Sequence, residues 1–253
     1  MPRLAGKVAL VGGAAQGMGA SHARAIVAEG GKVVIADILD ELGLALADQL
    51  GDSAIFVHLD VTKAADWSAA VDRAVIAFGS LNVLVNNAGI INHGLLDEYT
   101  LEQWNAIMTI NATGTFLGVK TALAALRAAA PSSVVNISSS DGLQGSVGRL
   151  GYTASKFAIT GMTKSLALEL GADGIRVNSI HPGGVRTSMA AGVDETAVSS
   201  ALRRFGDPIE ISNLVVYLAS DESSYSTGAA FVADGGMTAG IPAPTPRSDP
   251  AHV

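Results

Sequence analysis

The feature of this sequence that most limits its fold is the alternation of short apolar segments with longer helical patterns. Apolar segments that read as buried strands lie at residues 8–11, 33–36, 55–57, 83–85, 134–137, 177–180 and 230–232. Most of them lack polar alternation, so both faces of the sheet are expected to be covered. Helical patterns lie between them, at residues 17–29, 40–50, 63–78, 100–129, 152–170 and 207–219. The order predicts an α/β fold: a doubly wound, Rossmann-like parallel sheet of about seven strands with helices on both faces.

No internal repeat or linker divides the chain, and its 253 residues can fill a single α/β domain. We therefore expect residues 1–241 to form one dinucleotide-binding and catalytic domain. Residues 242–253 begin with alternating prolines, which cannot extend a helix or strand, and are expected to form an extended tail.

Composition argues against several classes of protein. The net charge is −7 and there is no run of Lys or Arg, which disfavours nucleic-acid binding because that depends on neutralising phosphates. No segment reaches the ~18 consecutive apolar residues of a membrane span, and the N-terminus lacks the apolar region of an export signal. The chain has no cysteine, which excludes disulfides and fits a cytoplasmic enzyme.

A glycine-rich segment, residues 12–19, follows the first expected strand and precedes the first helical pattern. Such a turn lets backbone N–H groups approach a pyrophosphate, and the helix N-terminus adds positive potential. A glycine motif alone also fits an ordinary tight turn, but this position favours the phosphate role. Asp37 ends the second strand, where dinucleotide sites place an acid that binds the adenosine ribose. The alternative is a helix N-cap, for which Asp37 or Asp40 would serve.

Two further strand ends carry polar residues that are expected to line the same site. Residues 58–61 close the third strand and residues 86–89 close the fourth. Ligands of such sheets bind outside the carboxyl ends of the strands. For Asn86 and Asn87 a structural role, in loop capping and strand pinning, stays open.

The candidate chemistry lies further along the chain. Residues 138–140 are three serines after the fifth strand, Asn111 lies in the helix before it, and Tyr152 and Lys156 open the next helix. The Tyr-x-x-x-Lys spacing puts both side chains on one helix face. A phenol has a pKa of about 10, and a nearby ammonium lowers it towards the range of a general acid or base. Alone, this spacing is usually a surface pair, and a serine run is usually a turn; their combination with a nucleotide site favours catalysis.

In this order the motifs resemble those of the short-chain dehydrogenase/reductase family, over residues 5–240. The matching pieces are Gly13-x-x-x-Gly17-x-Gly19, Asp60, Asn86-Asn87-Ala88-Gly89, Asn111, Ser139, Tyr152-x-x-x-Lys156 and Pro182-Gly183. Within the family the chain most resembles bacterial 3α(or 20β)-hydroxysteroid dehydrogenases, through residues 33–38, 135–139 and 214–228. Gly12 departs from the pattern, because the family usually has Thr there.

The resemblance implies an NAD(H)-dependent oxidoreductase that interconverts a secondary alcohol and a ketone. Ser139 would hydrogen-bond the substrate oxygen, and Tyr152 would exchange the proton. Lys156 would bind the nicotinamide ribose and tune Tyr152, while Asn111 would hold a water in a relay towards solvent. Cofactor contacts are expected from Gly13, Gln16, Gly17, Met18, Gly19, Asp37, Asp60, Val61, Asn87, Ala88, Gly89, Tyr152, Lys156, Pro182, Gly183, Val185 and Thr187.

The positions expected to line the substrate are mainly apolar. Besides Ser139 and Tyr152 they are Ile91, His93, Leu143, Gln144 and Met189, with Ile90, Val185 and Val193 as further candidates. They favour a bulky hydrophobic alcohol or ketone, such as a steroid or a cyclic or aryl ketone. The alternative is that several of them only pack the core. No metal site is expected, since the histidines are scattered.

Asp37 predicts NAD(H) rather than NADP(H), because its carboxylate would repel a 2′-phosphate. Two other functions stay open. A 3-oxoacyl-carrier-protein reductase-like enzyme is opposed by the acidic net charge and by Asp37. A non-catalytic NAD-binding protein has no use for Ser139, Tyr152 and Lys156 together.

We also expect a homotetramer. The sequence is 49% hydrophobic and only 15% charged, and surplus apolar surface usually lies in subunit contacts. Residues 100–129 and 152–170 are rich in small residues that allow close helix packing, and the resemblance implies a four-helix contact between subunits.

Overall fold

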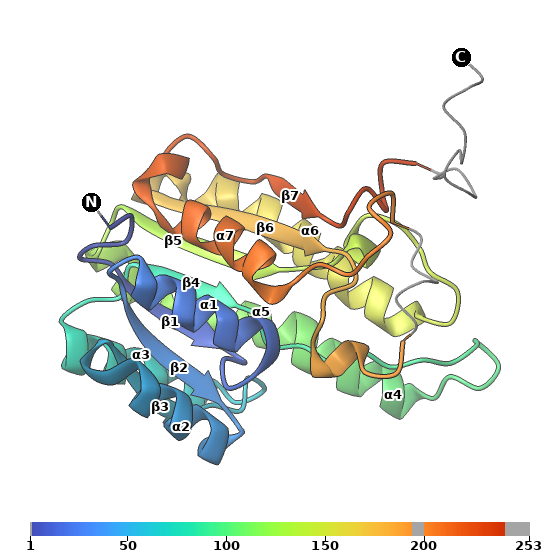
Figure 1. Cartoon of the computed structure of the whole chain (residues 1–253), viewed down its shortest axis with the longest axis horizontal. Coiled ribbons are helices and arrows are strands. Elements are labelled where there is room, and N and C mark those ends of the chain that lie inside the picture. Colours follow the sequence, from blue (N-terminus) through green and yellow to red (C-terminus); the bar gives the residue numbers. More distant parts are fainter. Residues whose placement is uncertain (1, 194–199, 241–253) are drawn as a thin grey trace, which may run out of the picture.

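The computed structural model describes residues 2–193 and 200–240, and it confirms the α/β architecture (Figure 1). Within these residues seven parallel strands form one sheet in the order β3-β2-β1-β4-β5-β6-β7. The strands are β1 (Val8–Gly12), β2 (Lys32–Asp37), β3 (Ala54–His58), β4 (Val83–Asn86), β5 (Ser132–Ile137), β6 (Ile175–Pro182) and β7 (Ala230–Ala233). The expected tail, residues 242–253, lies outside the described residues.

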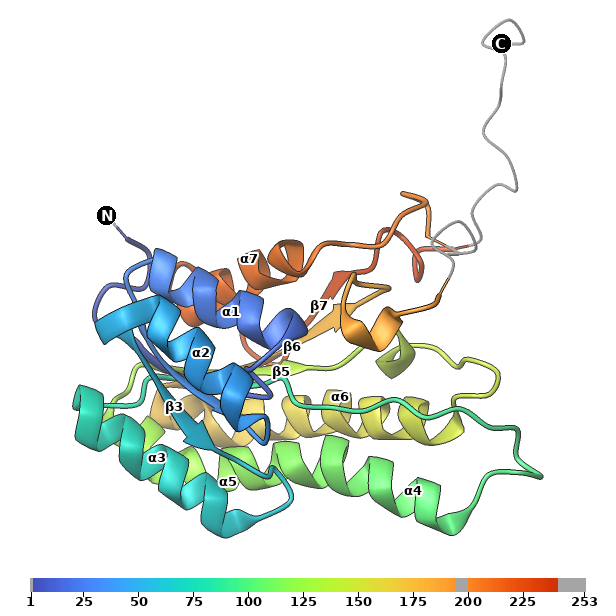
Figure 2. The same cartoon turned by 60° about the horizontal axis from the view of Figure 1, so that its bottom comes forward.

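Helices cover both faces of the sheet, as expected (Figure 2). The main helices are α1 (Gly17–Ala28), α2 (Asp40–Leu50), α3 (Ala64–Phe78), α4 (Leu101–Ile107), α5 (Gly114–Ala128), α6 (Leu150–Leu170) and α7 (Pro208–Ala219). α1, α2 and α7 pack on one face, whereas α3, α5 and α6 pack on the other. The two layers bury opposite sides of each central strand: Val33 and Ile35 of β2 join one core, and Val34 joins the other.

The expected helix over residues 100–129 is interrupted. A π-helical turn, Met108–Thr113, separates α4 from α5, and Asn111 lies within it. Thr115 donates a side-chain hydrogen bond to the Asn111 carbonyl (2.8 Å) beside the wider turn. Single π-helical turns inside α-helices often occur at functional sites, and a hydrophobic period of 3.6 residues does not reveal them.

Smaller boundary differences affect the candidate site. α6 begins at Leu150, so Tyr152 lies inside its first turn rather than opening it. β3 ends at His58, so Asp60 and Val61 belong to the following loop. Among the described residues, no helix is long and apolar enough to cross a membrane.

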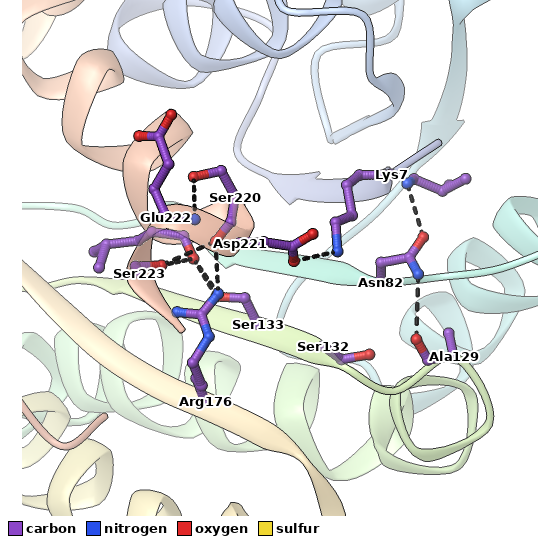
Figure 3. Close-up of polar contacts among 12 residues, drawn as sticks. Lys7, Asn82, Ala129, Ser132, Ser133, Arg176, Ser220, Asp221, Glu222 and Ser223 are labelled. Atoms are coloured by element: carbon purple, nitrogen blue, oxygen red, sulfur yellow. Dashed lines mark hydrogen bonds and ion pairs between the residues drawn. The ribbon is translucent and has the colours of Figure 1, made fainter. Parts of the chain in front are cut away.

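The amino edge of the sheet is closed by a polar network at the end of α7 (Figure 3). The Leu218 carbonyl accepts hydrogen bonds from Ser133 Oγ (2.7 Å), Arg176 Nη2 (2.9 Å) and Ser223 Oγ (3.1 Å). Lys7 forms an ion pair with Asp221 (2.8 Å) beside it. These bonds satisfy carbonyls at a helix C-terminus that have no partner within the helix.

The carboxyl edge is where the topology predicts a ligand. β1 pairs with β2 on one side and with β4 on the other, so the chain reverses its direction of winding between β1 and β4. In open parallel sheets ligands bind at such a point, outside the carboxyl ends of the strands. Gly12 and Asn86, the last residues of β1 and β4, are paired in register there.

Candidate active site

The glycine loop, residues 12–19, is held tightly between β2 and β4. Gly13 has a φ of +70°, and a Cβ on it would lie 2.7 Å from the Ala88 Cα, so both its conformation and its surroundings require glycine. The N–H groups of Gly13 and Ala14 donate to the Ala36 carbonyl, at 2.8 and 3.2 Å. The loop therefore passes very close to the end of β4, and Ala88 forms part of its wall.

Asn87 fixes this loop from the other side. Its Nδ2 donates to the Gly13 carbonyl (2.8 Å), and a Cβ on Gly19 would overlap both groups. Its Oδ1 is buried and has no hydrogen-bond partner among the described residues. Asn86 instead pins two strands, through Nδ2 to the Asn136 Oδ1 (2.9 Å). These bonds give both asparagines the structural role left open above, and Asn86 Oδ1 and Asn87 Oδ1 are both buried acceptors without a partner among the described residues.

Asp37 is buried and faces the glycine loop. Its Oδ2 accepts from the Ala15 N–H (2.9 Å), and its Oδ1 accepts from the Leu39 N–H (3.1 Å). The helix-cap alternative is wrong, since Leu39 is the N-cap of α2. Asp40 is the first helical residue, and its carboxylate contacts His58 Nδ1 (2.7 Å). Asp37 is thus in place to meet a ligand that lies on the loop.

Asp60 and Val61 follow β3, and both form hydrogen bonds with residues that follow them closely in the sequence. The Asp60 carboxylate accepts from Thr62 N–H (3.0 Å) and Thr62 Oγ (2.7 Å), and Lys63 lies 3.2 Å away. The hydrogen bonds from Thr62, with Lys63, hold the pKa of Asp60 below its usual value despite partial burial. The Val61 carbonyl accepts from the Trp67 indole (3.0 Å).

The three serines after β5 have different surroundings. Ser138 Oγ donates to the Lys156 carbonyl (3.0 Å), inside the packing against α6. Ser139 Oγ accepts from the Asp141 N–H (3.1 Å), and the Ser139 side chain acts to lower the pKa of the Tyr152 phenol. Ser139 is therefore the serine that the structure places beside Tyr152.

Tyr152 is 9% exposed, and burial raises the pKa of its phenol. The Ser139 side chain opposes this shift, Asp141 adds to it, and Arg149 opposes it. The expectation that Lys156 lowers the pKa of Tyr152 is wrong for this structure, because removing the phenolate from water has the largest effect.

Lys156 lies one turn from Tyr152 on the same face of α6, with Nζ 5.6 Å from the centre of the tyrosine ring. Its Nζ donates to the Ile137 carbonyl (2.9 Å) at the end of β5. Burial lowers the pKa of Lys156 to about 8. An ammonium has three N–H groups, and this bond uses one of them.

Asn111 is fully buried at the back of the same site. Its Oδ1 accepts from the Ile90 N–H (2.9 Å), and its Nδ2 donates to the Ile90 carbonyl (2.9 Å) and to Ser155 Oγ (3.0 Å). A Cβ on Gly89 would lie 3.3 Å from Asn111 Oδ1 and 3.5 Å from Lys156 Nζ. The π-helical turn thus joins α6 to the segment after β4.

The β6 loop, residues 183–187, follows Pro182 and closes over the glycine loop. A Cβ on Gly17 would lie 3.5 Å from Thr187 Cγ2, so the two loops are in contact distance. Val185 is buried and pairs with Gly206. The expected cofactor residues of both loops are therefore brought together.

An open cleft of about 300 Å³ lies beside this loop and is lined by Arg186, Thr187, Ala190, Val193 and Phe205. Met189, which is 49% exposed, belongs to the same short 3₁₀ turn as Ala190.

The other expected substrate residues lie on two loops joined to each other. The Gly94 N–H donates to the Gly148 carbonyl (3.0 Å), which ties the loop of Ile91 and His93 to that of Leu143 and Gln144. His93 and Leu143 are exposed.

A buried carboxylate near the site was not found from the sequence. Asp141 is 1% exposed and accepts from Ser146 Oγ (2.7 Å) and from Arg149 Nη1 (3.2 Å). Its neighbours in sequence suggested a simple turn. The only sign of a buried carboxylate in the sequence was Arg149, which lies three residues before Tyr152 and near the start of a helix.

Tyr99 was also missed, and it supports the start of α6. Its hydroxyl donates to Asn92 Oδ1 (2.7 Å) and lies where a Cβ on Gly151 would be. Glycine before Tyr152 is therefore required by a close contact.

The residues present fit a dinucleotide. Gly13 and Gly19 leave a space in the glycine loop that a Cβ on either residue would fill. Beside this cradle, Asn87 Oδ1 is a buried acceptor without a partner among the described residues. Asp37 adds a buried carboxylate next to it. The first turn of α1 consists of Gly17, Met18, Gly19 and Ala20, so no acidic side chain offsets its positive end. Among the described residues, no group of three or more His, Asp or Glu could hold a metal ion.

Comparison with known proteins gives a consistent result. Residues 13–238 match a family described as enoyl-(acyl carrier protein) reductase. The chain is 61% identical to the 3-alpha-(or 20-beta)-hydroxysteroid dehydrogenase of Mycobacterium tuberculosis (strain ATCC 25618 / H37Rv), over 94% of this chain and 92% of the relative. It is 49% identical to the trans-4-hydroxycyclohexanecarboxylate dehydrogenase of Sinomonas cyclohexanicum, over 94% and 95%. It is 39% identical to the cyclopentanol dehydrogenase of Comamonas testosteroni, over 94% and 100%.

Proposed function

Because the chain belongs to the short-chain dehydrogenase/reductase family, we propose that it interconverts a hydrophobic secondary alcohol and its ketone with NAD(H), using Tyr152 as general acid and base. Its class is that of an alcohol dehydrogenase or ketone reductase. The resemblance to bacterial hydroxysteroid dehydrogenases is confirmed by the identity with the mycobacterial enzyme.

The observation that carries the proposal is the grouping of Ser139, Tyr152 and Lys156 at the carboxyl edge of the sheet. All three are less than a tenth exposed, and the Ser139 side chain acts on the Tyr152 phenol by lowering its pKa. A protein that only binds nucleotides has no use for this group.

In ketone reduction the substrate oxygen gains negative charge. The Tyr152 hydroxyl donates its proton to that oxygen, and the Ser139 hydroxyl donates a hydrogen bond to it, which stabilises the charge as it develops. When bound, NADH supplies the hydride. In alcohol oxidation the deprotonated Tyr152 oxygen accepts the proton instead. Since burial raises the pKa of Tyr152, this direction is favoured at high pH.

Lys156 and Asn111 act around this pair. One N–H of the Lys156 ammonium is held by Ile137, which leaves donors for the hydroxyls of a nicotinamide ribose. We assign Asn111 to the water relay that leads from Lys156 towards solvent. Asn111 Oδ1 and Lys156 Nζ both lie within 3.5 Å of the position that a Cβ on Gly89 would occupy, which supports this role.

The cofactor proposal rests on Asp37. Its buried carboxylate can accept hydrogen bonds from adenosine ribose hydroxyls, and a 2′-phosphate beside it would be repelled. Gln16 and Ile38, the neighbouring side chains in sequence, are not cationic. The glycine loop, Asn87 to Gly89 and the β6 loop complete the proposed cofactor site.

The substrate proposal is a bulky apolar ketone or alcohol. The cleft beside the β6 loop is lined by Ala190, Val193 and Phe205 as well as by Arg186 and Thr187, and its apolar side chains favour an apolar ligand group. The relatives named above are dehydrogenases of a hydroxysteroid, of trans-4-hydroxycyclohexanecarboxylate and of cyclopentanol, which supports a ring-containing substrate.

The test is a panel of steroids, cyclic ketones and aryl ketones assayed by the oxidation of NADH. We expect turnover of at least one apolar ring ketone and little with charged compounds. A strong preference for an acyl carrier or a sugar phosphate would contradict the substrate proposal. Tight NADH binding without turnover of any ketone would favour a non-catalytic role.

A further inference from the structure

His181 is a buried histidine that the mechanism above does not use. It is the penultimate residue of β6, it is fully buried, and it directly precedes Pro182 and the β6 loop. Its Nδ1 lies 2.8 Å from the Ser139 carbonyl oxygen, and its Nε2 lies 2.8 Å from Ser179 Oγ.

The backbone explains why Ser139 needs this side chain. The β5–β6 ladder ends at the pair Ile137 and Ile180, and the Ser138 N–H makes the next hydrogen bond, to the Ile180 carbonyl (2.8 Å). Ser139 is the first residue beyond the ladder, so its carbonyl has no partner on the neighbouring strand. It accepts instead from the Gly142 N–H (2.9 Å) and from the imidazole of His181.

The hydrogen-bond partners determine which nitrogen of His181 carries the proton. The Ser139 carbonyl can only accept, so Nδ1 must be the donor. Nε2 of the neutral ring then accepts from the Ser179 hydroxyl, which fixes the plane of the ring. Burial lowers the pKa of His181; the bond to the Ser139 carbonyl opposes this shift and the charge of Lys156 adds to it, and the lowered pKa favours the neutral ring.

We propose that His181 is a positioning residue for the reaction, which holds the Ser139 carbonyl and thereby directs the Ser139 hydroxyl towards Tyr152 and the substrate oxygen. The inference rests on the proposed function. It adds that β6 fixes both walls of the site, since the strand that carries His181 continues into the loop proposed to bind the nicotinamide.

Two substitutions separate the two nitrogens of the ring. An Asn side chain places an amide N–H near the position of Nδ1, so His181→Asn can still donate to Ser139. A Gln side chain reaches the position of Nε2, so His181→Gln keeps a contact with Ser179 and loses the bond to Ser139. His22→Gln is the matched control, because His22 is also fully buried and bonds a serine through Nδ1 (2.8 Å to Ser212) but lies between α1 and α7.

We expect His181→Gln to lower kcat by about 10- to 100-fold, as small misplacements of catalytic groups do. KM and the Kd of NADH should change little, and His181→Asn and His22→Gln should stay close to the parent. The pH profile gives a second readout, because the Ser139 side chain opposes the rise in the pKa of Tyr152 that burial causes. His181→Gln should therefore shift the pH profile of alcohol oxidation to higher pH. The charged residues around Tyr152, which are Asp141, Arg149 and Lys156, are unchanged in this variant. Equal kcat values for the Asn and Gln variants, whether high or low, would overturn the proposal.

A measurement on the parent covers the case in which a variant does not fold. In ¹⁵N-labelled protein, the NMR shifts of His181 should show a protonated Nδ1 and an unprotonated Nε2. The opposite tautomer would overturn the proposal without any assay. Lack of turnover by the parent would instead count against the proposed function, and the tautomer would still decide whether His181 holds Ser139.

Discussion

Asp37 is the residue on which the choice of cofactor depends most directly. We predict that the parent has a higher kcat/KM with NADH than with NADPH, and that Asp37→Ala reduces this preference. The reason is that the variant loses both the ribose acceptor and the charge that repels a 2′-phosphate. Asp40→Ala is the control, since Asp40 is an acid of the same segment with its carboxylate turned to His58. Preference for NADPH in the parent, or an unchanged preference in Asp37→Ala, would contradict the assignment.

Asp141 controls a different property, the pH at which Tyr152 loses its proton. Its charge adds to the effect of burial and raises the pKa of Tyr152. Asp141→Asn removes the charge, so we predict that the pH profile of alcohol oxidation shifts to lower pH. Asp173→Asn is the control, because Asp173 pairs with Arg127 on the surface. A shift in the opposite direction, or none, would show that Asp141 does not act on Tyr152.

Asp37 and Asp141 also show how far the surroundings of a single residue could be predicted from the sequence. The position of Asp37 after a strand and a glycine motif was enough to predict that it faces the loop. Asp141 follows three serines, and nothing in that pattern indicates that a carboxylate is buried there. Its burial depends on Ser146 and Arg149, which fold back from the next loop.

His22 of α1 is fully buried against α7, where its Nδ1 lies 2.8 Å from Ser212 Oγ. Burial lowers the pKa of His22 to about 3, from 6.5 in the unfolded chain. Between these pH values the unfolded chain binds the extra proton, so stability falls as the pH falls, by about 1.4 kcal/mol per pH unit. We predict that His22→Gln reduces the loss of stability between neutral and acidic pH, measured by urea unfolding. His93→Gln, at an exposed loop position, should leave that loss as in the parent. An unchanged pH dependence in His22→Gln would contradict the prediction.

The order and type of the elements were predictable because buried parallel strands are continuous apolar segments, and these are bounded by polar turns. The π-helical turn at Met108–Thr113 was not, since it differs from an α-helix in hydrogen bonding rather than in which residues face the core. At the start of α6, Gly151 is in close contact with Tyr99, which comes from a distant segment of the chain. Helix and strand propensities contain no information about such contacts.

For the whole molecule we predict a homotetramer. Phe116 of α5 is 46% exposed, and Phe157 and Leu168 of α6 are 46% and 88% exposed. Large apolar side chains on the outer faces of neighbouring helices are typical of subunit contacts. Light scattering at micromolar concentration should give four times the mass of the chain. A monomeric mass would contradict the prediction, and Leu168→Lys should weaken the assembly if α6 forms the contact.

We propose above that this molecule is an oxidoreductase whose proton transfer is carried out by Tyr152. The most direct test measures kcat and the Kd of NADH for the parent and for Tyr152→Phe, with an apolar ketone that the parent reduces. Removing the hydroxyl leaves the ring and the cofactor cradle intact, so we predict a fall in kcat of about 100- to 10,000-fold with NADH binding nearly unchanged. Turnover by Tyr152→Phe close to that of the parent would contradict the account.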